Sequence, residues 1–163
     1  MRNVIATTTF RTAGVARILI VDDEPSMRTM LTAALSGEGY QVDCAASGVE
    51  ALGHLGRETV DVVISDVMMP GMNGIELLKE IKRGAPEIEV ILMTGCCSVQ
   101  LIEEALRSGA MACLEKNSTG FVLKLLAEVE QALNHPNFLD GCRGLRCLQT
   151  QPPRHEPGRL LPE

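Results

Sequence analysis

Two short apolar runs, each ending directly in carboxylate residues, constrain the fold of this chain more than any other feature of its sequence. The first run, 17–21, leads straight into Asp22 and Asp23, and the second, 60–65, leads into Asp66. Short runs rich in Val and Ile that end at turn residues are typical of buried parallel strands. If both strands point the same way, the three aspartates meet at the carboxyl edge of one sheet, where open α/β sheets carry their sites.

The rest of the sequence alternates between strand and helix patterns. Strands are predicted over 17–21, 41–45, 60–65, 89–93 and 111–114. Helices are predicted from Pro25 to Gly37, over Val49 to Leu55, from Gly74 to Gly84, from Leu101 to Gly109, and from Phe121 to Leu133. Five consecutive β/α units predict an α/β fold with a parallel sheet, right-handed crossovers and helices on both faces.

The three aspartates at this edge would repel one another. Like charges a few Å apart raise each other's pKa values, and a bound divalent cation would relieve the repulsion. Because the cluster of Asp22, Asp23 and Asp66 offers only oxygen ligands, it suits Mg²⁺. The plainer alternative is that Asp22 and Asp23 cap the helix that follows them. Their register with Asp66 favours a functional site.

Two further polar residues follow strands at the same edge. Thr94 follows the fourth predicted strand and Lys116 follows the fifth. Three carboxylates, a hydroxyl and an ammonium together suit phosphoryl transfer to a carboxylate, with Asp66 as the nucleophile and Thr94 and Lys116 on the phosphoryl oxygens. The plainer alternatives are that the Thr94 hydroxyl bonds only to nearby backbone at the end of its strand, and that Lys116 is a solvated loop lysine.

With these residues in place, the chain resembles the receiver domain of two-component response regulators. The matching motifs, in order, are 20–24 (IVDDE), 66–74 (DVMMPGMNG), 93–95 (MTG) and 114–116 (LEK). Each motif is weak alone, but all four in this order and spacing are specific, and the resemblance covers about residues 15–134. It implies a flavodoxin-like fold with strand order 2-1-3-4-5, the order found in chemotaxis receivers.

The resemblance also implies a role for each site residue. Asp66 would accept a phosphoryl group from a histidine kinase or a histidine phosphotransfer protein. Mg²⁺ would be bound by Asp22, mainly through water, by Asp23, by Asp66 and by the backbone carbonyl of Met68. Thr94 would be the switch hydroxyl and Lys116 the phosphate-binding lysine. Such a domain is not an enzyme in its own right, although it assists its own phosphorylation and dephosphorylation.

Two positions depart from the family pattern. Where the family usually has a switch aromatic, three residues before the lysine, this chain has Cys113. A cysteine cannot fill the space of a ring, so we expect a weak or altered response of the output face. Where the family usually has proline after the lysine, this chain has Asn117, so we expect a trans peptide at that bond and a mobile Lys116 before phosphorylation.

The lifetime of the phosphorylated form can also be predicted from the resemblance. In the family, the residues two after the phosphoacceptor and two after the switch threonine influence the position of the attacking water. Here these are Met68 and Cys96, and neither side chain is a good partner for water. We therefore expect slow hydrolysis.

The charge distribution argues against direct nucleic-acid binding. Residues 17–134 contain 9 Lys and Arg against 18 Asp and Glu, a net charge of −9, with no basic stripe. No apolar stretch approaches the roughly 20 residues that a membrane span needs, and the amino terminus lacks a secretory signal. The six cysteines show no zinc-binding spacing, so reduced, buried thiols are expected, although Cys142 and Cys147 leave a metal site or a disulfide open. Together these features predict a cytoplasmic protein.

The ends of the chain lack the alternating pattern. We predict an N-terminal extension over 1–16, a receiver domain over 17–134, and a disordered or loosely packed tail over 135–163. The first interpretation is a single-domain regulator that acts through protein contacts on an unidentified target, with a homodimer left open. Alternatives are a fragment of a larger regulator and a pseudo-receiver that only binds partners. A phosphatase of the haloacid-dehalogenase type would need a D-x-D pair, whereas Asp22 and Asp23 are adjacent.

Overall fold

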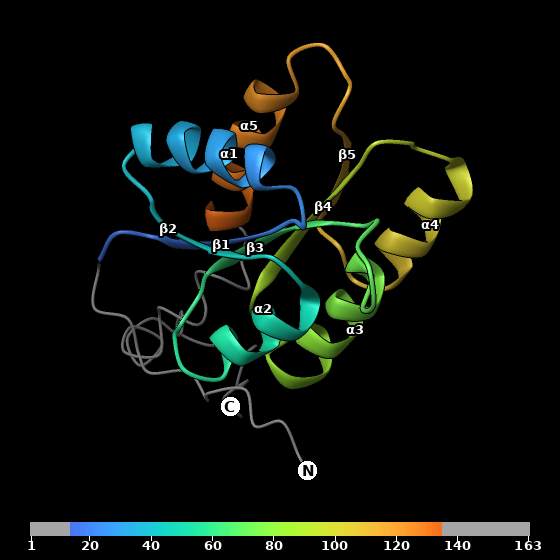
Figure 1. Cartoon of the computed structure of the whole chain (residues 1–163), viewed down its shortest axis with the longest axis horizontal. Coiled ribbons are helices and arrows are strands. Elements are labelled where there is room, and N and C mark those ends of the chain that lie inside the picture. Colours follow the sequence, from blue (N-terminus) through green and yellow to red (C-terminus); the bar gives the residue numbers. More distant parts are fainter. Residues whose placement is uncertain (1–13, 135–163) are drawn as a thin grey trace, which may run out of the picture.

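A computed structural model describes residues 14–134 as one sheet covered on both faces by helices (Figure 1). The strands are β1 (Arg17–Val21), β2 (Gln41–Ala45), β3 (Val62–Asp66), β4 (Glu89–Thr94) and β5 (Ala112–Glu115). The helices are α1 (Pro25–Gly37), α2 (Gly48–Leu55), α3 (Gly74–Gly84), α4 (Val99–Arg107) and α5 (Phe121–Asn134). Residues 1–13 of the predicted extension (1–16) and the whole predicted tail (135–163) lie outside the described residues.

All the strand pairs are parallel, and the strand order is β2-β1-β3-β4-β5. The prediction of a flavodoxin-like α/β fold with order 2-1-3-4-5 is therefore confirmed. β3 lies at the centre of this order, so both of its faces and both of its edges are covered. Three strands differ from the predicted bounds by one or two residues at an end. β4 extends to Thr94, β5 begins at Ala112, and β3 begins at Val62.

The core has two layers that lie on opposite faces of the sheet. Ile18 and Ile20 of β1 pack with α1 and α5, whereas Leu19 and Val21 pack with α2, α3 and α4. Successive side chains of a strand point to opposite faces, so a strand buried on both faces must be apolar at every position. This requirement explains why the run 17–21 lacks the polar alternation of a half-exposed strand.

Local signals in the sequence set the helix boundaries. Pro25 occupies the first turn of α1, where its missing N–H leaves no donor unsatisfied. The side chain of Asn73 accepts hydrogen bonds from the N–H groups of Ile75 and Glu76, and the Glu76 carboxylate accepts from the N–H of Asn73. This capping box fixes the start of α3 close to the end of β3.

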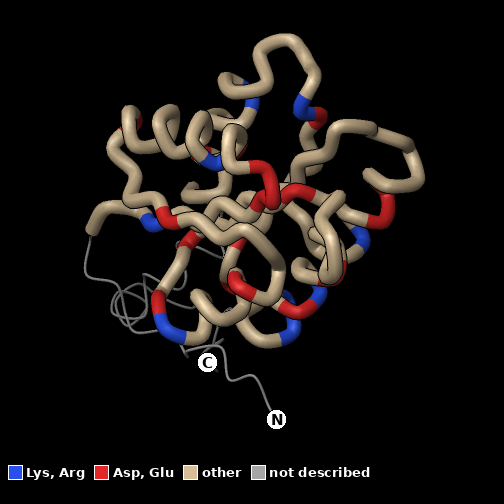
Figure 2. The backbone as a smooth tube through the Cα atoms, viewed as in Figure 1, with Lys and Arg blue, Asp and Glu red and all other residues tan. Residues whose placement is uncertain are grey.

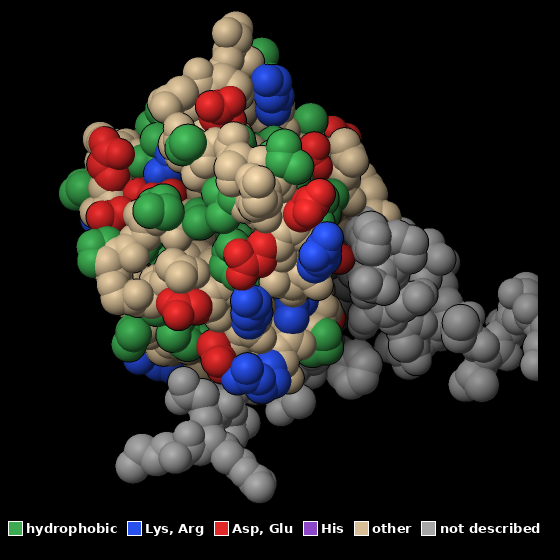
Figure 3. Space-filling view, turned by 90° about the vertical axis from the view of Figure 1, so that its right-hand side faces the viewer, with side chains coloured by type: hydrophobic (Ala, Val, Ile, Leu, Met, Phe, Trp, Pro, Cys, Tyr) green, Lys and Arg blue, Asp and Glu red, His purple; other side chains and the backbone are tan. Residues whose placement is uncertain are grey.

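The surface carries charged and apolar side chains side by side. In the face turned toward the viewer in Figure 3, hydrophobic side chains form small groups separated by acidic and basic ones. Val99 and Leu106 of α4 are 68% and 49% exposed. Among the described helices, none combines the length and the apolar character needed to cross a bilayer.

Candidate functional site

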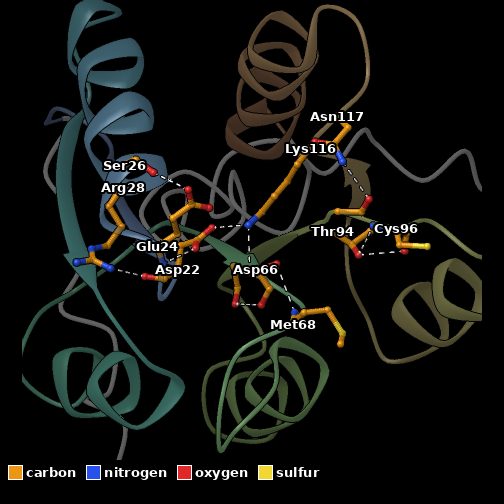
Figure 4. Close-up of polar contacts among 12 residues, drawn as sticks. Asp22, Glu24, Ser26, Arg28, Asp66, Met68, Thr94, Cys96, Lys116 and Asn117 are labelled. Carbon is orange, nitrogen blue, oxygen red and sulfur yellow. Dashed lines mark hydrogen bonds and ion pairs between the residues drawn. The ribbon is translucent and has the colours of Figure 1, made fainter.

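The residues singled out in the sequence meet where β1, β3, β4 and β5 end (Figure 4). The register explains this, because Val21 pairs with Ser65, Asp66 with Met93, and Thr94 with Glu115. The strands therefore end at nearly the same level, and the residues that follow them share one edge. In Figure 2 the acidic segments after β1 and β3 meet near the middle of the view.

The three aspartates lie together, as the parallel strands predict. Asp22, Asp23 and Asp66 each offer a carboxylate oxygen, and these oxygens lie within 4.8 Å of one another. Asp22 is fully buried, Asp66 is 5% exposed, and Asp23 is open to solvent. The acidic cluster is therefore partly buried, and one of its three carboxylates is exposed.

Hydrogen bonds hold the buried aspartates in place. One oxygen of Asp22 accepts the N–H of Glu24 at 2.9 Å, and one oxygen of Asp66 accepts the N–H of Met68 at 3.3 Å. Arg28 of α1 donates to the backbone carbonyl of Asp22 at 2.6 Å. Neither aspartate of the first pair caps α1, because the N-cap residue is Glu24 and its side chain makes no capping bond. The helix-capping alternative therefore does not describe this structure.

Lys116 is the cation of the site. Its ammonium donates a hydrogen bond to Asp22 Oδ2 at 2.7 Å and forms an ion pair with Asp66 Oδ2 at 3.1 Å. Only 11% of its side chain is exposed. The expectation of a mobile lysine before phosphorylation is wrong for this structure, because two buried carboxylates hold the ammonium. The solvated-lysine alternative fails for the same reason.

Burial and the ion pair shift the pKa values of Asp66 and Lys116 in opposite directions. Burial raises the pKa of Asp66, and the contact with Lys116 offsets part of that rise. Burial also opposes a charge on Lys116, but the bonds to Asp22 and Asp66 outweigh it and raise the pKa of the ammonium. Lys116 therefore stays charged at neutral pH and helps Asp66 to remain ionised.

Hydrogen bonds to residues at the end of β4 hold the loop after β5, and the peptide bond that follows Lys116 is trans. No cis peptide bond is present among residues 14–134, so the predicted trans bond between Lys116 and Asn117 is confirmed. The N–H of Lys116 donates to the carbonyl of Thr94 at 2.8 Å, and the side-chain amide of Asn117 donates to the carbonyl of Gly95 at 3.2 Å. The contact made by Asn117 could not be predicted from the sequence, because it joins two loops.

Thr94 is fully buried at the end of β4. Its hydroxyl donates a hydrogen bond to the carbonyl of Cys96 at 3.1 Å and accepts one from the backbone N–H of the same residue at 3.2 Å (Figure 4). In this structure the hydroxyl thus binds the backbone of the β4–α4 loop, residues 95–98, which is the plainer alternative for a strand-end threonine. A switch role for Thr94 stays a prediction.

The donor set fits a hard divalent cation. The pocket holds three carboxylates and one ammonium, and every candidate ligand atom on the three aspartates is oxygen. A cation with two charges would balance the excess negative charge and satisfy the oxygens left free by Lys116. Met68 follows Asp66 in the same loop with a side chain 72% exposed, and its carbonyl oxygen remains a predicted ligand.

A close backbone approach at Gly74 places α3 directly against the end of β3. A Cβ at this position would collide with the carbonyl oxygen of Asp66 and lie 2.9 Å from the Cα of Val67. The N–H of Gly74 donates to the carbonyl of Val67 at 3.0 Å. The sequence predicted a helix start at Gly74 but not this contact, since spacing alone does not show how near two backbones pass.

The four cysteines within residues 14–134 are less buried than the sequence suggested. Cys44 and Cys96 are exposed, Cys97 and Cys113 are partly buried, and all four are free thiols. The expectation of buried thiols is therefore wrong for the described cysteines, because they lie on the edge strands and in a surface loop. Cys142 and Cys147 lie outside the described residues.

Comparisons with known proteins identify the family of this chain. A family model described as the response regulator receiver domain matches residues 18–128. The transcriptional regulatory protein ZraR of Escherichia coli K12 is 43% identical over 123 residues, which cover 76% of this chain and 27% of that protein. The DNA-binding transcriptional regulator NtrC of the same strain is 37% identical over 118 residues, 72% of this chain and 25% of that protein. The chain thus matches about a quarter of the length of these relatives.

Solved structures show the same architecture. A receiver domain from Clostridium thermocellum has a TM-score of 0.70 and 31% identity, covering 77% of this chain and 99% of its own. The Vibrio cholerae chemotaxis protein CheY4 has a TM-score of 0.68 and 33% identity, covering 74% and 100%. Thermotoga maritima TrrA, solved with Mg²⁺ and beryllofluoride, has a TM-score of 0.66 and 33% identity, covering 73% and 100%. This chain therefore belongs to the receiver domain family of two-component response regulators.

Proposed function

We propose that this domain accepts a phosphoryl group on Asp66 from the phosphohistidine of a histidine kinase or of a histidine phosphotransfer protein. The observation that carries the proposal is the position of Asp66, a buried carboxylate at the end of the central strand with the Lys116 ammonium 3.1 Å away. Asp22 and Asp23 complete a pocket in which negative charge is concentrated. A carboxylate beside a fixed cation is suited to attack an electrophile whose own oxygens carry negative charge.

The transfer itself requires little from the protein besides positioning and charge. A carboxylate oxygen of Asp66 attacks phosphorus, the new O–P bond forms, and the P–N bond to the donor imidazole breaks. The electron pair of the broken bond returns to the imidazole nitrogen. Lys116 keeps Asp66 ionised beforehand and binds a phosphoryl oxygen afterwards. This role requires its ammonium to shift only a short way from Asp66 Oδ2, to which it is already paired.

Mg²⁺ would be held by Asp22, Asp23, Asp66 and the backbone carbonyl of Met68. A cation bound there offsets negative charge on the transferring phosphoryl group. Asp22 is fully buried and already accepts hydrogen bonds from Lys116 and from the N–H of Glu24, so we assign it to contact through water. Asp23 is exposed, so it would be free to bind the cation directly. This division of roles agrees with their different burial.

Thr94 is the proposed link between phosphorylation and the surface. Its hydroxyl now bonds with the backbone of Cys96 in the β4–α4 loop. If the hydroxyl turns to bind a phosphoryl oxygen on Asp66, it must leave these contacts, and the loop loses its anchor to β4. Two exclusive sets of hydrogen bonds for one hydroxyl provide the two-state element that a switch requires.

The proposed domain boundaries and partners follow the same reasoning. We assign the receiver to residues 17–134 and regard the chain as a single-domain regulator or as the receiver part of a larger one. The named relatives are transcriptional regulators about four times as long as the matched segment. With a charge of −9 over these residues, the receiver itself is unsuited to contact the phosphate backbone of DNA. A protein surface is the proposed partner in either case.

Mg²⁺-dependent labelling by a small phosphodonor tests the proposal. Acetyl phosphate with Mg²⁺ should add one phosphoryl group to the intact chain, visible by mass spectrometry, and chelation of the metal should prevent it. Asp23→Asn should weaken labelling strongly, because it removes the exposed metal ligand. An unmodified chain after prolonged incubation with both reagents would favour a pseudo-receiver instead.

Slow hydrolysis of the phosphorylated form is a separate expected result. The side chain of Met68 is 72% exposed, and in Figure 4 it points away from Asp66. Cys96, an exposed residue between β4 and α4, offers only a weakly polar thiol. Replacing them together, as Met68→Asn with Cys96→Glu, should speed loss of the phosphoryl group several-fold by supplying partners for the attacking water. An unchanged decay rate, followed by intact mass over time, would show that these positions do not reach that water.

A further inference from the structure

The loop between β1 and α1 carries two of the three aspartates of the acidic cluster. This β1–α1 loop, residues 22–24, joins the end of β1 to the start of α1. Asp22 is buried, whereas Asp23 is exposed. Within residues 14–134, no hydrogen bond or ion pair holds the Asp23 carboxylate. The backbone on either side of Asp23 must therefore set the place of this carboxylate.

A guanidinium from α1 fixes the backbone of the β1–α1 loop. The Nη1 atom of Arg28 donates a hydrogen bond to the carbonyl oxygen of Asp22 at 2.6 Å. That carbonyl belongs to the peptide that joins Asp22 to Asp23, so the bond acts on the backbone directly next to the exposed carboxylate. A hydrogen bond from a charged donor is among the stronger ones in proteins.

The carbonyl of Asp22 needs a donor from outside the sheet. The pairs that β1 forms with β2 and β3 end at Val21. The N–H of Asp22 still donates to the carbonyl of Ala45 at 3.2 Å, but the carbonyl of Asp22 lies beyond the last pairs. Pro25 at the start of α1 has no N–H to offer. Because a partly buried carbonyl without a donor costs free energy, the bond from Arg28 completes the end of the strand.

Asp22 is bound by a cation at its backbone and by another at its side chain. Figure 4 shows Arg28 on one side of Asp22 and Lys116 on the other. Lys116 donates to the carboxylate at 2.7 Å, and the N–H of Glu24 donates to the other carboxylate oxygen at 2.9 Å. The side chain and the backbone of Asp22 are therefore both fixed by donors of the protein.

The position of Arg28 in α1 is not one that stabilises the helix. Arg28 is the fourth residue of α1, which begins at Pro25, and the first turn contains no acidic residue. The amino end of a helix carries partial positive charge, so a cation near it is unfavourable. The contribution of Arg28 lies instead in its contact with the β1–α1 loop.

We propose that Arg28 is a positioning residue for the Mg²⁺ site. By holding the peptide between Asp22 and Asp23, it keeps the Asp23 carboxylate within 4.8 Å of the oxygens of Asp22 and Asp66. A guanidinium has no acceptor atom, so Arg28 is not itself a ligand and acts through the backbone. The inference rests on the proposed function, because it concerns the cation assigned to these aspartates.

Charge and positioning predict opposite effects of removing Arg28. The guanidinium and Mg²⁺ are both positive, so loss of the charge alone would make Mg²⁺ bind more tightly. Loss of the hydrogen bond frees the peptide between Asp22 and Asp23, and ordering it again on binding costs free energy. Weaker Mg²⁺ binding in a variant that has lost a nearby cation therefore identifies the positioning effect.

The affinity for Mg²⁺ is measured on the full, isotopically labelled chain by adding MgCl₂ and following the backbone amide NMR signals of Asp23 and Asp66. Arg28→Met, which has neither charge nor donor, should weaken binding about 10-fold or more. Arg28→Lys, which keeps a charge and a donor of similar reach, should recover most of the affinity. Arg28→Gln, whose side chain is too short to reach the carbonyl, should match Arg28→Met and replaces it if the methionine variant does not fold.

Arg107→Met on α4 is the matched control. The side chain of Arg107 is 80% exposed and pairs with Glu103 of the same helix. The control removes the same charge far from the acidic cluster in the sequence, and it should leave the Mg²⁺ affinity unchanged. Before Mg²⁺ is added, the amide signal of Asp23 should move in Arg28→Met and stay in place in Arg107→Met, because that N–H belongs to the same peptide as the bonded carbonyl.

Three results would overturn the role of Arg28. They are Mg²⁺ binding by Arg28→Met as tight as that of wild type or tighter, an Asp23 amide signal that does not move in this variant, and Arg28→Lys binding as weakly as Arg28→Met. The last result would show that the effect does not pass through the hydrogen bond. A wild-type chain that does not respond to Mg²⁺ would overturn the proposed metal site itself, which is a different result from an unchanged affinity in Arg28→Met.

Discussion

Replacing Lys116 with methionine is expected to lower the free energy of unfolding by about 3–5 kcal/mol at pH 7 in the absence of Mg²⁺. The ammonium contacts two carboxylates, Asp22 and Asp66, whose side chains are 0% and 7% exposed. Methionine has a similar length but no charge, so it leaves both carboxylates buried without a cation. Urea unfolding followed by circular dichroism measures the difference.

The pH dependence of this loss has a definite sign. The pKa of Asp66 is raised by burial even with Lys116 present, and removing the ammonium should raise it further. Below the ordinary pKa of a carboxyl group Asp66 is neutral, and Lys116 has little to stabilise. The difference between variant and wild type should therefore be small in acid and grow as pH rises through the titration of Asp66.

Mg²⁺ and a distant lysine provide the controls. Saturating Mg²⁺ should reduce the difference in unfolding free energy between wild type and Lys116→Met, because the cation supplies the positive charge that the variant lacks. Lys124→Met, at an exposed position of α5, should change stability by less than about 0.5 kcal/mol. A Lys116→Met variant as stable as wild type at pH 7 would contradict the geometry of the ion pair.

Replacing Gly74 with alanine should destabilise the domain by about 2–3 kcal/mol and weaken phosphorylation at the same time. The new Cβ would collide with the carbonyl oxygen of Asp66 and crowd the Cα of Val67, and both are backbone atoms that no rotamer change can move. Relief requires α3 or the end of β3 to shift. Either movement displaces the phosphoacceptor from its partners, so thermal unfolding and acetyl phosphate labelling should both report it.

Gly53 is the matched control for this substitution. It lies inside α2, and the position that a Cβ would take there has no neighbouring atom within 4 Å. Gly53→Ala should therefore stabilise the domain by about 0.5–1 kcal/mol through helix propensity. Stability changes of opposite sign for Gly74→Ala and Gly53→Ala would show that the loss at Gly74 comes from the close backbone approach and not from adding a methyl group to a helix. Equal, small effects at both positions would show that α3 is not held against β3 as described.

The sequence predicted the architecture because its signals are local. Runs that are apolar at every position mark strands buried on both faces, and Pro25 and Asn73 mark helix starts. Parallel strands then place the residues after them on one edge, which is why Asp22, Asp66 and Lys116 could be grouped from the sequence alone. The alternation of neighbouring β1 residues between two core layers follows from the pleat of the strand.

The finer contacts of the site depend on how separate loops meet, and no local signal encodes that. The partner of the Thr94 hydroxyl, the bond from Asn117 to Gly95 and the close approach at Gly74 depend on the exact paths of the loops. Lys116 was expected to be mobile because the sequence could not show that its ammonium reaches two carboxylates at once.

Identification of the phosphorylated residue is the sharpest test of the proposed function. The chain is labelled with acetyl phosphate and Mg²⁺, reduced with borohydride, which converts an aspartyl phosphate to homoserine, and sequenced by mass spectrometry. We predict homoserine at position 66 alone, and no label in Asp66→Asn. Homoserine at another aspartate, or equal labelling of the Asp66→Asn variant, would contradict the assignment of Asp66 as the phosphoacceptor.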